Sequence, residues 1–147
     1  MNEPPPEPEP HREGIDWIRD KHEHIHHPLQ YRCSESMMKF WKLVDKLKGK
    51  KSEDKNIGQF IGEWMTAGAK LAGVLDGIAK DRGTADAGFT VACLKRALGH
   101  LHQSQAGLEA VAPKKLLPEK TIAEGRKELL EIRECILKLM DQLRGRN

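Results

Sequence analysis

The sequence has little that would cross-link the chain or embed it in a membrane. Its three cysteines, Cys33, Cys93 and Cys135, are far apart and never in a CxxC spacing, so neither a disulfide framework nor a zinc clip is indicated. No apolar run approaches the roughly 18 residues that cross a bilayer, and the first ten residues, MNEPPPEPEP, do not resemble a secretory signal. We expect reduced thiols, no membrane association and a cytoplasmic location.

Catalytic signatures are also missing. The sequence has no GxSxG turn, no GxxxxGK[ST] phosphate loop and no GxGxxG following a strand. No segment shows the polar–apolar alternation that is typical of a strand. These absences favour a helical protein that is not an enzyme, with no catalytic residue, no cofactor and no metal.

The composition indicates one domain behind a short tail. At 147 residues the chain is large enough for a single core, and 38% hydrophobic with 32% charged residues suits amphipathic helices. Five of the first ten residues are prolines, interspersed with Glu3, Glu7 and Glu9, and such a segment cannot offset its own ordering entropy. We expect a disordered acidic tail over 1–13 and one helical domain over 14–147.

Apolar residues recur every three or four positions along most of that domain, which is the period of a helix. We expect helices from 15 to about 27, from 34 or 36 to 49, from 57 to about 81, from 84 or 86 to 113, and from 121 to the end. Pro28 would close the first, and Thr121 with Glu124 would form a capping box for the last. Short connections favour an all-α, up-and-down antiparallel four-helix bundle with a short extra N-terminal helix.

Small residues form rows on the segment 57–81. Gly58 and Gly62 are four residues apart, and Ala69, Gly73 and Gly77 repeat that spacing. Each glycine inside a helix costs about 0.8–1 kcal/mol relative to alanine. The row therefore predicts close approach of another helix, within the chain or between subunits.

Basic side chains are the main functional signal. The formal charge is +3. Lysine and arginine side chains that contact phosphates would give salt-sensitive nucleic-acid binding with little sequence specificity, although outward faces of amphipathic helices carry such residues too. The candidate residues are Lys42, Lys46, Lys50, Lys51, Lys95, Arg96, Lys114, Lys115, Arg126 and Lys127.

Two other patterns leave alternative functions open. His22, His24 and His26 lie in a histidine-rich run, and His22 and His26 would share a helical face that could bind a transition metal. Arg96 and His102 have the spacing found in helical ribonucleases of the HEPN class. Six helical steps nevertheless turn these two side chains away from each other, so surface solvation is the simpler interpretation.

The order of four segments resembles a known family: FWKLVDKL, AGAKLAGVLDGIAKDRG, CLKRALGHLHQSQAGLE and LLPEKTIAEGRKELLEIRECILKLMDQLR. Over about residues 37–144 the layout is similar to four-helix bundle proteins related to ribosomal-RNA intervening-sequence proteins and to the accessory variability determinants of diversity-generating retroelements. The resemblance implies a homo-oligomer, a pentameric ring, with no catalytic site. It also implies a basic surface that binds nucleic acid or a reverse transcriptase.

Overall fold

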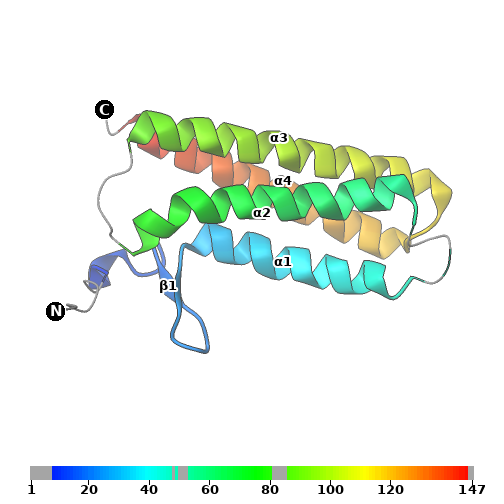
Figure 1. The fold of residues 1–147 in the computed structure, drawn as a ribbon, viewed down its shortest axis with the longest axis horizontal. Coiled ribbons are helices and arrows are strands. Elements are labelled where there is room, and N and C mark those ends of the chain that lie inside the picture. Colours follow the sequence, from blue (N-terminus) through cyan, green and yellow to red (C-terminus); the bar gives the residue numbers. More distant parts are fainter. Residues whose placement is uncertain (1–7, 48, 50–52, 81–85, 146–147) are drawn as a thin grey trace.

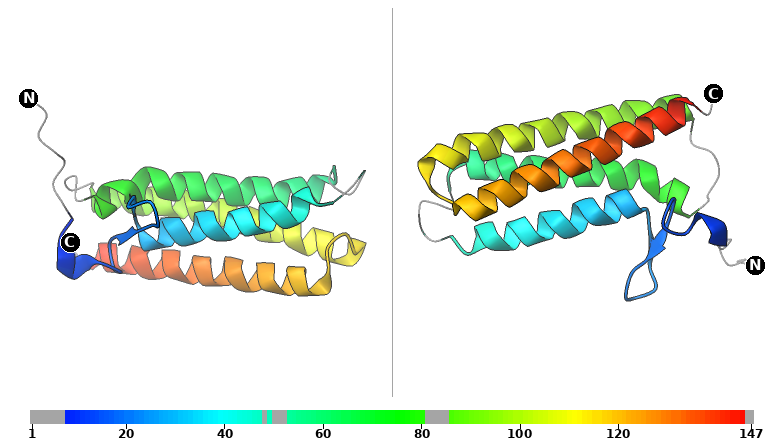
Figure 2. Two further views of the ribbon diagram at one scale, coloured as in Figure 1. Left: turned by 90° about the horizontal axis from the view of Figure 1, so that it is seen from below. Right: turned by 180° about the vertical axis from the view of Figure 1, so that it is seen from behind.

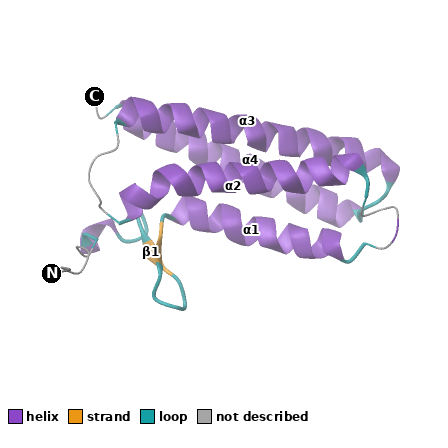
Figure 3. Cartoon of the chain, in the orientation of Figure 1, coloured by secondary structure: helices purple, strands orange, loops and turns teal. Residues whose placement is uncertain are grey.

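The computed structural model describes residues 8–47, 49, 53–80 and 86–145. Its four long helices run up and down in turn and pack as an antiparallel bundle (Figure 1; Figure 2), which confirms the predicted fold class. They are α1 (Pro28–Asp45), α2 (Lys55–Ala79), α3 (Ala87–Val111) and α4 (Glu119–Arg144). The minor elements are the 3-10 helices η1 (Pro10–Arg12) and η3 (Ala112–Lys114) and the antiparallel strands β1 (Ile18–Arg19) and β2 (Ile25–His26) (Figure 3).

An aromatic cluster packs α1 against α2. The ring of Phe40 lies 6.0 Å from that of Phe60 and 5.1 Å from that of Trp64, measured between centroids. Below this cluster, the buried Sγ of Cys33 lies close to Gly68. These contacts place residue 40 of α1 level with residues 60–64 of α2, and they bury the periodic apolar stripes that predicted the helices.

The helices α2 and α3 approach each other closely at a position that the sequence pattern did not predict. A Cβ atom added to Gly107 would lie 2.7 Å from the backbone nitrogen of Phe60 and 2.9 Å from the carbonyl oxygen of Asn56. One turn away, the Ser104 hydroxyl donates a 2.6 Å hydrogen bond to the Phe60 carbonyl. A glycine and a serine therefore allow the two backbones to come almost into contact.

The glycine row of α2 does not have the role within the chain that its spacing predicts. A Cβ added to Gly58, Gly62, Gly73 or Gly77 would meet nothing within 4 Å, and Ala69 is exposed. The prediction of close packing within the subunit is wrong, because the row lies on the outer side of the helix.

The N-terminal segment departs from the predicted helix over 15–27. Residues 18–19 and 25–26 pair as a hairpin instead. Pro28 begins α1 rather than closing a helix, since proline lacks only an N–H that the first helical turn leaves unpaired. His27 caps this turn by accepting the Leu29 N–H at its Nδ1, at 3.1 Å. Ser36, one of the two expected starts of this helix, lies inside α1, where its hydroxyl donates to the Arg32 carbonyl.

The predicted disordered tail is structured where it is described. The indole N–H of Trp17 donates to the Glu9 carbonyl at 2.9 Å, and Pro8 is buried. Residues 1–7 lie outside the described residues. The tail prediction failed for 8–13 because Trp17, itself 6% exposed, supplies the apolar contact that the segment lacks.

The helix starts give a mixed outcome. Residue 86 is one of the two expected starts of its helix, and Asp86 caps α3, with Oδ1 accepting the Gly88 N–H at 2.8 Å. The predicted capping box at Thr121 is wrong: α4 already begins at Glu119, and Thr121 is buried inside it.

The cysteines Cys33, Cys93 and Cys135 are free thiols. Across the part of the chain that the structure describes, no helix has the length and hydropathy needed to span a membrane.

Candidate nucleic-acid interface

Two connections meet at one end of the bundle. The end of α1, the start of α2 and the segment between α3 and α4 lie at one end of the bundle, opposite the described N- and C-terminal ends of the chain (Figure 1). The Nζ of Lys114 joins them, because it lies 2.8 Å from Asp54 Oδ2 and 2.8 Å from Asn56 Oδ1, at the start of α2. Residues distant in sequence thereby share one surface.

This end carries the positive charge of the chain. The described residues of the segments 42–55 and 112–127, which we call the basic end, include eight Lys and Arg residues and five Asp and Glu residues. The described residues elsewhere include twelve Lys and Arg and fourteen Asp and Glu. A net positive end on an otherwise slightly acidic chain is the electrostatic arrangement that attracts a polyanion.

Several cations of the basic end have no carboxylate partner. Among the described residues, no Asp or Glu oxygen lies within 4.0 Å of their ammonium groups, and all are exposed. They are Lys42, Lys46, Lys55, Lys115 and Lys127. These side chains are available for phosphate contacts without first breaking an ion pair.

Two predicted cations are paired instead. Lys114 lies 2.8 Å from Asp54 and holds the pKa of that carboxyl below its usual range by hydrogen bonding. Arg126 donates from Nη2 to Glu109 at 2.9 Å, and this hydrogen bond lowers the pKa of Glu109. Both pairs face solvent, so each contributes little to stability.

The remaining predicted cations divide by position. Lys95 and Arg96 are exposed on α3, but they lie about 22 Å along the helix from its end at Val111, so the structure does not bring them to the basic end. Lys50 and Lys51 fall outside the described residues. Lys55 was missed by the sequence analysis, because its place in the first turn of α2 is evident only once Asp54 is seen to cap that helix.

A hollow of about 850 Å³ opens beside η3. Lys115, which has a left-handed backbone with φ of 57°, and Arg126 contribute its cationic side chains. Leu116, Leu117 and Ile122 contribute apolar ones, and Glu119 is its carboxylate. The hollow therefore adds a concave, mixed surface to the basic end.

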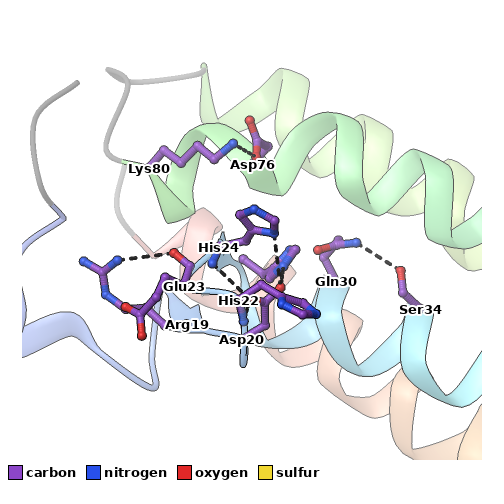
Figure 4. A network of polar contacts seen from close by, with 10 residues as sticks. Arg19, Asp20, His22, Glu23, His24, Gln30, Ser34, Asp76 and Lys80 are labelled. Atoms are coloured by element: carbon purple, nitrogen blue, oxygen red, sulfur yellow. Dashed lines mark hydrogen bonds and ion pairs between the residues drawn. The ribbon is translucent and has the colours of Figure 1, made fainter. Parts of the chain in front are cut away.

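The histidine-rich run forms a hairpin turn around one carboxylate (Figure 4). Oδ1 of Asp20 accepts the N–H groups of His22 at 2.8 Å and His24 at 3.0 Å, while Oδ2 lies 2.9 Å from His26 Nε2. The hydrogen bond with His26 is the main reason that the pKa of Asp20 falls to about 2. The predicted helical pairing of His22 with His26 is wrong, and the described residues contain no cluster of three or more ligands arranged for a metal ion.

The ribonuclease alternative receives no support from the geometry. His102 and Arg96 lie on one helix, six residues apart and about 120° apart around its axis. The Nε2 of His102 instead accepts from Nε of Arg133 on α4, at 3.3 Å. His102 thus faces α4 and is turned away from Arg96.

The comparisons with known proteins are negative. No protein-family model, curated protein or solved structure matches the chain. The resemblance noted above therefore stays an expectation, and the basic end has to be interpreted from its own chemistry.

Proposed function

We propose that this protein is a non-catalytic helical bundle that binds nucleic acid, RNA or DNA, through its basic end. The observation that carries the proposal is the convergence, at one end of the bundle, of the lysines at the end of α1 and the start of α2 with those that follow α3, joined by the contact of Lys114 with Asp54 and Asn56. Backbone phosphates are the ligand that such a surface favours, because binding releases the counterions condensed on them.

Binding should fall steeply with salt. The logarithm of the association constant should decrease linearly with the logarithm of salt concentration, with a slope of about −0.7 to −0.9 per phosphate contacted. Replacing Lys42, Lys46 and Lys115 by glutamine removes three unpaired cations of the basic end. Fluorescence anisotropy with generic RNA and DNA should show the slope become smaller in magnitude by about 2.

A control variant of equal charge separates location from net charge. Lys21, Lys70 and Lys138 are exposed, lie outside the basic end, and have no carboxylate within 4.0 Å among the described residues. Their replacement by glutamine should leave the slope nearly unchanged. Equal effects of the two triple variants, or salt-independent binding of the unmodified protein, would remove the proposal.

The oligomeric state and the partner complete the proposal. The outward glycine row of α2, with Gly62 and Gly73 facing open space, suits contact with a second copy of the chain, as in the implied homo-oligomer and its pentameric ring. A nucleic-acid-handling protein such as a reverse transcriptase would meet the same basic end, in the cytoplasm. Light scattering of the purified protein tests assembly, and a monomer would contradict that part.

A further inference from the structure

The three tryptophans differ sharply in exposure. Trp17 is 6% exposed and Trp64 is fully buried, whereas Trp41 on α1 is 39% exposed. Placing a large apolar ring at the surface is unfavourable for the isolated bundle. Trp41 therefore leaves part of its indole ring in contact with solvent, which does not stabilise the bundle.

Trp41 lies among the unpaired cations of the basic end. It immediately precedes Lys42, and Lys46 lies five residues after it, about 140° further around the helix axis; both lysines are exposed and have no ion-pair partner among the described residues. Met38, 42% exposed, lies one turn before Trp41 on the same helix. An exposed aromatic ring and two unpaired cationic side chains therefore lie within about one and a half turns at the end of α1.

The neighbouring helix leaves space beside this ring. Phe40 contacts Phe60 and Trp64, so Trp41 is level with the segment of α2 around 58–62. Lys39 and Arg32 face carboxylates of α4. Trp41 lies about 200° around the helix from Lys39 and is therefore on the side of α1 towards α2. Gly58 and Gly62 have no neighbouring atom within 4 Å of an added Cβ, and no side chain rises there.

We propose that Trp41 is a stacking platform for a nucleobase, so that the basic end prefers single-stranded nucleic acid over duplex. This inference rests on the proposed function. A base in a duplex already has both faces stacked, whereas an unpaired base can place one face on the indole while Lys42 and Lys46 contact the adjoining phosphates. Aromatic rings beside backbone-tracking cations are the chemistry by which proteins hold single strands without reading their sequence.

Phe89 provides a matched comparison. It is 62% exposed, more than Trp41, but it lies in the first turn of α3, at the opposite end of the bundle. If exposure of an aromatic ring were sufficient, Phe89 would serve equally well. The proposal assigns the role to Trp41 because of its cationic neighbours.

The test measures the affinity of Trp41→Ala, Trp41→Phe and Phe89→Ala by fluorescence anisotropy. Three probes of one sequence are used: single-stranded DNA, single-stranded RNA and the DNA duplex. Trp41→Ala should weaken single-strand binding about tenfold, with less than about a twofold change for the duplex and an unchanged salt slope, since no phosphate contact is lost. Trp41→Phe should retain most of the affinity, and Phe89→Ala all of it. Single strands should also quench the fluorescence of the unmodified protein and not that of Trp41→Phe.

The outcomes separate the two proposals. Salt-dependent binding of single strands and duplex, with no selective loss in Trp41→Ala, overturns the stacking role and leaves the basic end intact. A change in solution mass in Trp41→Ala, with binding unaltered, assigns the ring to a subunit contact and also overturns it. If the unmodified protein binds none of the probes, both proposals fail. Helical circular dichroism confirms that each variant is folded.

Discussion

Replacing Gly107 by alanine should destabilise the protein by forcing α2 and α3 apart. The new methyl group would lie 2.7 Å from the Phe60 nitrogen and 2.9 Å from the Asn56 oxygen, both of which are backbone atoms. A side chain could rotate away, but the backbone of a helix packed on both sides cannot. The whole of α2 must therefore shift or the contact must remain strained.

The magnitude follows from two opposing terms. Overpacking of a buried contact costs about 3 kcal/mol when no rotamer change relieves it. Alanine in place of glycine returns about 1 kcal/mol of helix propensity. The free energy of unfolding should thus fall by about 2 kcal/mol, which corresponds to a decrease in Tm of about 4–8 °C for a chain of this length.

Gly99→Ala is the control on the same helix. An added Cβ at Gly99 meets nothing within 4 Å, so only the propensity term applies and stability should rise by about 0.5–1 kcal/mol. Urea unfolding followed by circular dichroism, at one protein concentration, measures both variants. If Gly107→Ala proved as stable as Gly99→Ala, the close approach of α2 and α3 would be refuted.

Two further predictions concern buried titratable groups. Burial lowers the pKa of His27 from 6.5 to about 4, so the folded state binds this proton more weakly than the unfolded state does. The free energy of unfolding therefore keeps the full contribution of His27 above pH 6.5 and loses about 3 kcal/mol as the pH falls to 4. Urea midpoints across this window should decrease less in His27→Asn. Burial also raises the pKa of Cys33 to about 11, so mass spectrometry should show iodoacetamide modifying the partly exposed Cys93 and Cys135 while Cys33 stays unmodified unless the protein is unfolded.

Periodicity predicted the fold class because each long helix buries one face. It failed at Pro28, whose ring is compatible with both a helix end and a helix start, and the choice was decided by the hairpin and the His27 cap. The glycines show the same limit. The row of Gly58 and Gly62 is conspicuous in sequence yet faces open space, whereas Gly107 and Gly125 lie against neighbouring helices. Spacing along one helix does not reveal which face a partner covers.

The candidate site was only partly predictable. A sequence shows how many lysines a chain has, but their grouping depends on which connections meet in space. Lys42 near the end of α1 and Lys115 in the connection between α3 and α4 share the basic end, whereas Arg96 has similar chemistry and lies elsewhere. The pairing of Arg126 with Glu109 is likewise a tertiary contact between α3 and α4 that no local pattern specifies.

The described ends of the chain, Pro8 and Gly145, lie at the same end of the bundle, away from the basic end (Figure 1). A helix the length of α2 spans about 37 Å. A group attached at Pro8 or Gly145 therefore joins the bundle about one helix length from the lysines. Immobilising the protein through a terminal tag presents those lysines outward, towards the solution.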